Sequence, residues 1–123
     1  MIGYITLGTN DMKRSAAFYD KLLAEVGAKR VMEQQDSFIV WGNSPTGAAL
    51  SVTKPFDGKP ATVGNGLMVA LAVKEPAQVD KLYKKALELG AQDEGAAGPR
   101  GQGFYAGYFR DPDGNKLNVF CMT

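Results

Sequence analysis

The chain has 123 residues, with 14 Lys and Arg against 13 Asp and Glu, one cysteine and no histidine. This length suits one domain with a sizeable core, and a net charge of +1 with both signs interspersed does not favour nucleic acid as a partner. The lone Cys121 excludes an internal disulfide, and the lack of histidine removes the commonest metal ligand and the only side chain that titrates near neutrality.

The chain is expected to be cytoplasmic and to have no membrane partner. Its first residues lack the basic and apolar segments of a signal peptide. The longest apolar run, residues 67–73, is far shorter than the roughly 20 residues that a membrane-spanning helix needs.

The first half of the chain is predicted to form a strand, a helix and three strands. Alternation in residues 2–7 predicts the first strand, and Asn10 or Asp11 offers the N-cap of a helix that ends at Gly27. The solvent face of this helix is expected to hold Lys13, Arg14, Asp20 and Lys21. The three strands are predicted at residues 29–33, 37–41 and 48–53.

The second half repeats this order. Residues 67–73 predict a strand, and Glu75 is the expected N-cap of a helix that begins with Pro76 and ends at Gly90. Three strands are again predicted, at residues 91–94, 104–110 and 116–121. The glycine-rich residues 95–103 are predicted to be a mobile loop, and residues 111–115 a turn whose two aspartates serve its geometry.

The two halves also match residue by residue, because residues 19–23 align with residues 83–87 and Gly27-Ala28 with Gly90-Ala91. We therefore predict an α+β protein of tandem βαβββ repeats. Residues 1–123 would form one domain, made of copies at about 1–54 and 66–123 with a linker at 55–65. Because neither copy has enough core alone, their sheets are expected to form one curved mixed sheet around a central cleft.

This pattern resembles the vicinal oxygen chelate superfamily, which includes glyoxalase I, fosfomycin-resistance enzymes, bleomycin-resistance proteins and extradiol dioxygenases. The resemblance covers essentially the whole chain and is most specific in residues 5–8, 15–20 and 109–117. In the metal-dependent members, a His on the first strand of each copy and a Glu on the last strand of one or both copies bind a divalent ion. Matching the motifs puts these positions at Tyr4, Met68, Ser51 and Asn118.

The resemblance thus implies a member that lacks the usual metal ligands and needs no cofactor. A phenol, a thioether, a hydroxyl and a carboxamide offer neither negative charge nor imidazole to a divalent ion. Two interpretations of this centre stay open. It is either a metal-free pocket for a small organic molecule or a filled core in which Tyr4 and Met68 occupy the cleft.

Further candidates surround the four positions. Strand parity places Lys116 and Phe120 on the face of Asn118, while Cys121 on the opposite face is expected to be a core thiol. Arg100 could meet an anion at the mouth of the cleft. Trp41 and Tyr105 could supply aromatic walls for a ligand or simply pack within their strands.

Three functions remain open, and no catalytic residue is assigned. The leading hypothesis is a metal-independent protein, similar to glyoxalase and bleomycin-resistance proteins, that binds or sequesters a small organic molecule between the repeats. The alternative is a lyase, isomerase or epimerase of the same superfamily, with Tyr4 or Lys116 as proton donor and Asn118 as oxyanion partner. The third is a structural or partner protein with a plugged site. The resemblance also implies a homodimer.

Overall fold

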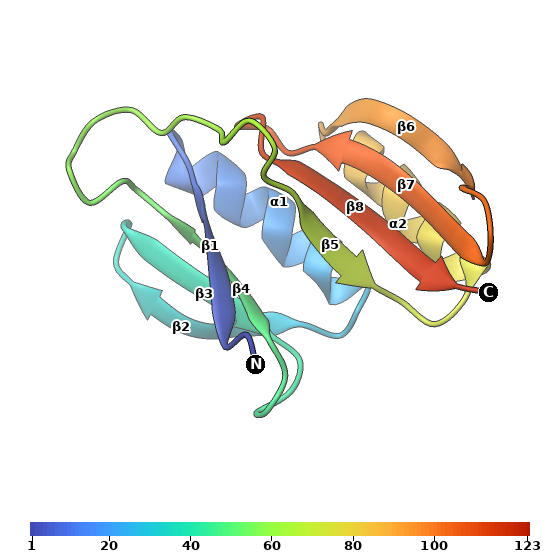
Figure 1. Ribbon diagram of the computed structural model, residues 1–123. Coiled ribbons are helices and arrows are strands. Elements are labelled where there is room, and N and C mark those ends of the chain that lie inside the picture. Colours follow the sequence, from blue (N-terminus) through green and yellow to red (C-terminus); the bar gives the residue numbers. More distant parts are fainter. The chain divides into compact units, whose positions relative to one another are not determined.

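The computed structural model describes all of residues 1–123, and its elements follow the order βαβββ twice (Figure 1). The first copy contains β1 (Tyr4–Gly8), α1 (Met12–Ala24), β2 (Lys29–Gln34), β3 (Phe38–Gly42) and β4 (Ala49–Thr53). The second contains β5 (Val69–Ala72), α2 (Pro76–Glu88), β6 (Gln92–Pro99), β7 (Phe104–Arg110) and β8 (Lys116–Met122). The predicted α+β fold of tandem βαβββ repeats is confirmed.

The chain divides into two compact units, residues 1–63 and residues 64–123, and each has its own four-stranded mixed sheet. Strand order is β1-β4-β3-β2 in the first and β5-β8-β7-β6 in the second. In both, the first and last strands of the copy run parallel and the other neighbours are antiparallel. One curved sheet around a central cleft, within a single domain, stays a prediction.

The core of the first unit lies between α1 and its sheet. The side chain of Asp11 caps α1 by accepting the N–H of Arg14 at 3.0 Å, as the sequence predicts. Apolar residues at helical spacing then turn one face of α1 to the sheet. The buried core residues of the helix and strands include Phe18, Tyr19, Leu22, Leu23, Ile39, Trp41, Leu50 and Val52.

The second unit repeats this packing, with α2 against β6, β7 and β8. Pro76 occupies the first turn of α2, where its missing N–H breaks no helical bond. The buried residues here include Val79, Leu82, Ala86, Phe109, Leu117, Val119 and Cys121. Cys121 is therefore a core thiol, because alternate residues of β8 point toward the helix.

Most strands begin or end one or two residues from their predicted limits, and the differences at β6 and β5 matter most for the candidate site. β6 extends to Pro99, so residues 95–99 belong to a strand and not to a mobile loop. They pair with β7, with irregularities in register between Asp93 and Gly98. Tertiary pairing with β7 therefore outweighs the low strand propensity of Gly and Pro. At the other edge of this sheet, β5 begins only at Val69, which leaves Met68 just before it.

The loop after β4 is attached to the first unit. The side chain of Asn10 accepts the N–H of Ala61 at 2.6 Å and donates to its carbonyl at 3.1 Å.

The turn at residues 111–115 is also held by hydrogen bonds, because the carboxylate of Asp111 accepts the N–H groups of Asp113 and Asn115. Neither helix has the length and apolar character that crossing a lipid bilayer requires.

Candidate functional site

The four positions matched to metal ligands occupy equivalent places in the two units. Ser51 of β4 pairs with the β1 residue two positions after Tyr4. Asn118 of β8 pairs with the β5 residue two positions after Met68. Tyr4, Ser51 and Asn118 belong to the sheet face opposite the helix, because the neighbouring strand residues on the other parity pack against α1 or α2, whereas Met68 lies just before β5.

In the first unit, the polar groups of this face are already paired. Ser51 is fully buried, and its hydroxyl donates to the carbonyl of Ile5 at 2.9 Å and lies 2.7 Å from the hydroxyl of Thr6. The Tyr4 ring is 61% exposed and meets Phe38 edge-on, with centroids 6.4 Å apart. Since their strands flank β4, the two rings meet across β4 on the face of Ser51.

In the second unit, the same face contains a buried acceptor without a donor. Asn118 is 1% exposed, and its Oδ1 has no hydrogen-bond partner. Its neighbour on β7 is Tyr108. The Lys116 ammonium lies 5.7 Å from the centroid of the Tyr108 ring, and the Arg100 guanidinium lies 5.5 Å from it. Asn118 is therefore paired, across the two strands, with a tyrosine whose ring is flanked by two cations.

One carboxylate balances part of this positive charge. Glu94 accepts a hydrogen bond from Nε of Arg110 at 2.7 Å, and its other oxygen lies 3.9 Å from the Lys116 ammonium. The bond from Arg110, which outweighs the opposing effect of burial, lowers the pKa of Glu94 below its usual value. Glu94 therefore loses its charge at a lower pH than an ordinary glutamate, and its contact with Lys116, at 3.9 Å, is a long ion pair.

Of the other sequence candidates, Phe120 shares this face, whereas Arg100 is turned onto its own segment. The Phe120 ring lies 5.3 Å from that of Phe104, in a tilted stack. Arg100 donates to the carbonyls of Ala96 and Pro99, so its guanidinium rests against the strand β6. Met68 is 41% exposed.

Trp41 and Tyr105 do not join Ser51 and Asn118, because both lie on the helix-covered faces. The indole N–H of Trp41 donates to Asp20 of α1 at 2.9 Å. The hydroxyl of Tyr105 donates to Asp80 of α2 at 2.7 Å. The sequence could have shown this, because successive residues of a strand point to opposite faces of the sheet.

The same alternation would have identified Tyr108, which is not among the candidates selected from the sequence. It pairs directly with Asn118 and is half-buried beside it.

These residues do not fit the divalent ion of the metal-dependent relatives. The hydroxyl proton of Ser51 is used by the Ile5 carbonyl, and the other three positions offer a phenol, a thioether and an uncharged amide. Nowhere in the structure do three or more His, Cys, Asp or Glu side chains gather as a metal site would require.

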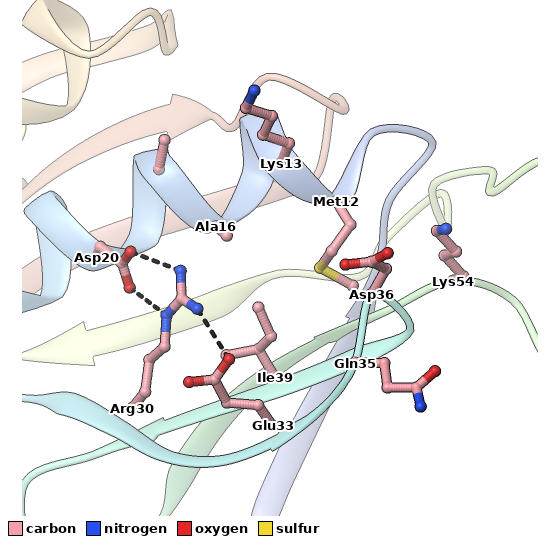
Figure 2. Close-up of a pocket in the computed structure, with 11 residues that line it drawn as sticks. Met12, Lys13, Ala16, Asp20, Arg30, Glu33, Gln35, Asp36, Ile39 and Lys54 are labelled. Atoms are coloured by element: carbon pink, nitrogen blue, oxygen red, sulfur yellow. Dashed lines mark hydrogen bonds and ion pairs between the residues drawn. The ribbon is translucent and has the colours of Figure 1, made fainter.

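A separate pocket of about 620 Å³ opens in the first unit, between α1 and the β2–β3 hairpin (Figure 2). It is lined by Met12, Lys13, Ala16, Ala17, Asp20, Arg30, Glu33, Gln35, Asp36, Ile39 and Lys54. None of the sequence-predicted site residues lines it. Asp20, expected on the solvent face of α1, bonds instead to Arg30 and Trp41. No sequence spacing signals this contact, because it joins a helix to two strands.

Comparison with solved structures gives many matches over the whole chain. A glyoxalase/bleomycin resistance protein from Albidiferax ferrireducens is 32% identical, with 100% of this chain and 99% of that chain covered and a TM-score of 0.91. A glyoxalase-related enzyme from Fulvimarina pelagi is 24% identical, covering 98% and 87%, with a TM-score of 0.77. A lactoylglutathione lyase from Agrobacterium tumefaciens is 20% identical, covering 98% and 92%, with a TM-score of 0.72.

The two structures below 25% identity are evidence for the fold alone. Among proteins of curated function, none matches. Residues 1–119 match the family described as Glyoxalase/Bleomycin resistance protein/Dioxygenase superfamily. With this match over nearly the whole chain, the shared βαβββ repeats and the 32% identical relative, the chain belongs to the Glyoxalase/Bleomycin resistance protein/Dioxygenase superfamily.

Proposed function

We propose that this protein binds a small organic molecule, without a divalent metal, on the sheet face that carries Asn118. The observation that supports this most is the buried Oδ1 of Asn118, which has no donor. A buried acceptor left unpaired costs about 1–3 kcal/mol, and folded proteins retain few of them. Because this oxygen is buried, a ligand with a hydroxyl or N–H group would supply the missing donor once the side chains that cover the oxygen move aside.

The neighbouring side chains favour a polar ligand with a flat or negatively charged part. Tyr108 offers a ring beside Asn118, and the ammonium of Lys116 lies on the same face. Lys116 is 3.9 Å from Glu94, so a ligand anion could compete for it without first breaking a short ion pair.

Thermal unfolding tests this proposal most directly. We expect small hydroxylated or amide-bearing organic molecules to raise the melting temperature in a concentration-dependent way, while divalent ions have no such effect. Asn118→Leu should abolish the rise, and Ser15→Ala, which also removes a buried unpaired oxygen, should retain it. Stabilisation by micromolar divalent ions, with none by any organic molecule, would contradict the proposal.

The position of the ligand is tested by a matched aromatic pair. Tyr108→Leu should weaken binding, because it removes the ring beside Asn118. Tyr105 is on the same strand but points to the opposite face of the sheet, toward α2. Tyr105→Leu should therefore leave binding unchanged. Equal effects of the two variants would place the ligand elsewhere.

A lyase or isomerase activity is the alternative, and the lactoylglutathione lyase among the similar structures supports it at the level of fold. Lys116 is the residue of this face best placed to exchange a proton with a ligand at Asn118, since both are on β8 with one residue between them. Turnover that does not vary between pH 6 and pH 9 and survives Lys116→Met would exclude this role.

We further propose a cytoplasmic homodimer in which each chain forms one domain. The support for the dimer is the family's usual assembly, and the support for a reducing compartment is the single cysteine, Cys121, which is a buried free thiol. Light scattering after size-exclusion chromatography should give twice the chain mass of 13.2 kDa. A mass equal to that of one chain across the micromolar range would contradict the dimer.

A further inference from the structure

The pocket beside α1 includes a position at which the second copy has a helix–strand bridge that the first copy lacks. In the second unit, the hydroxyl of Tyr105 at the start of β7 donates to Asp80 of α2 at 2.7 Å. The strand registers and helix bounds place Ser37 and Ala16 at the equivalent positions of the first unit. Two short side chains therefore stand where an aromatic residue and a carboxylate join strand to helix, and Ala16 is one of the residues that line the space between α1 and the hairpin (Figure 2).

The floor of this pocket is apolar. Met12, Ala16 and Ile39 line it and are at most 7% exposed, because they also belong to the core under α1. A volume of about 620 Å³ falls within the 300–1,000 Å³ usual for small-molecule sites. An aliphatic group laid on this floor would lose its contact with water.

One end of the pocket is closed by charges that satisfy one another. Arg30 donates to both oxygens of Asp20, at 2.8 and 2.7 Å, and to Glu33 at 3.1 Å (Figure 2). Asp20 also accepts the Trp41 indole N–H. The bonds from Arg30, together with that from Trp41, lower the pKa of Asp20. This end therefore offers no free charge to a ligand.

The other end carries one unpaired charge of each sign. Asp36 and Lys54 line the pocket and take part in none of the ion pairs of the structure. A backbone bond of 2.9 Å from the N–H of Lys54 to the carbonyl of Ser37 keeps their two segments together. Lys13 also lines the pocket, but Figure 2 shows its ammonium directed away from the hairpin.

We propose that this pocket binds a zwitterionic, amino-acid-like molecule with an aliphatic side chain. Its ammonium group pairs with Asp36, its carboxylate pairs with Lys54, and its side chain lies on Met12, Ala16 and Ile39. Both charges of the ligand are then matched by groups that lack a partner in the protein, and a molecule with one charge leaves the other group unmatched. This site is built from the first unit alone and does not depend on the proposed function at Asn118.

Leucine and its two truncated analogues test the proposal. Titration of the isotope-labelled protein, followed by backbone amide signals, should show saturable shifts for residues 12–20 and 33–39 with leucine. 4-Methylpentanoate lacks the ammonium group and isoamylamine lacks the carboxylate, and each should bind about tenfold more weakly. Asp36→Asn should abolish the preference over 4-methylpentanoate, and Lys54→Met the preference over isoamylamine. Lys59→Met, in the following loop, is the matched control and should change neither.

A variant that copies the second unit provides the structural test. Ala16→Asp combined with Ser37→Tyr should recreate the bridge, close the pocket and abolish leucine binding, while the melting transition remains cooperative. If this pair fails to fold, Ala16→Leu fills the same space with an apolar group. Asn118→Leu should leave leucine binding intact, which separates this site from the one proposed above.

Three results would overturn the inference. They are no saturable binding of leucine up to about 10 mM, equal binding of leucine and either analogue, and leucine binding that survives closure of the pocket.

Discussion

Arg30 of β2 donates to both carboxylate oxygens of Asp20 of α1, at 2.8 and 2.7 Å, and so joins the helix to the edge strand of its sheet. Two parallel bonds make this geometry more rigid than a single contact between point charges. The pair is about one-third exposed on each side, which limits its contribution to stability through solvent screening.

Arg30→Met should lower the free energy of unfolding by about 0.5–1 kcal/mol, because it removes the ion pair but keeps much of the aliphatic stem. Urea denaturation at pH 7 measures the change. Lys21→Met is the control and should have little effect, because Lys21 lies on the exposed surface of α1 and forms no ion pair. A variant as stable as the wild type would show that the pair only orients the hairpin.

The same pair predicts how stability depends on pH. Because the pKa of Asp20 in the folded protein is below its ordinary value of 3.8, the unfolded chain binds the proton more readily. The stabilisation is therefore complete above 3.8 and is lost as the pH falls through the lowered pKa. Arg30→Met should have a weaker acid dependence than the wild type when unfolding is measured from pH 6 down to pH 2. Parallel curves would show that other carboxylates, such as Glu94, dominate the acid dependence.

Ser15 and Asn118 each bury an oxygen without a hydrogen-bond partner. Ser15→Ala and Asn118→Leu should both raise the free energy of unfolding, by about 1 kcal/mol, because an unpaired buried polar group is removed. Chemical denaturation tests both. Only Asn118→Leu should also impair ligand binding, so stability gained at the expense of function is expected at Asn118 alone. A loss of stability in Asn118→Leu would mean that the amide contributes to packing more than its unpaired oxygen costs.

Gly107 lies directly under the ring of Tyr83, and a Cβ there would come within 2.9 Å of Cδ1 and 3.1 Å of Cβ of that residue. Gly107→Ala should therefore lower the free energy of unfolding by about 1–3 kcal/mol, because the crowded Tyr83 Cβ cannot rotate away. Gly3→Ala, where no atom lies within 4 Å, is the control. The thermal melting temperatures of the two variants provide the comparison.

Local features of the sequence determined the elements of this protein and their repetition. The cap at Asp11, the proline at the start of α2, and the apolar spacing of both helices depend on neighbours within a few residues, so the sequence alone predicts them. The equivalence of Ser51 and Asn118 also followed from the repeat, and the strand registers agree with it. The absence of histidine, and with it of the family's usual ligands, is a property of the sequence itself.

Only the tertiary structure decided what those elements place together. Residues 95–99 form a strand because β7 lies beside them, although glycine and proline favour a loop. Tyr105 and Trp41 bond to helices, and the pocket beside α1 is lined by residues of the helix, of the β2–β3 hairpin and by Lys54. Each of these outcomes depends on contacts between elements distant in sequence, whose register and docking are set by the packing of the whole unit and not by any local pattern.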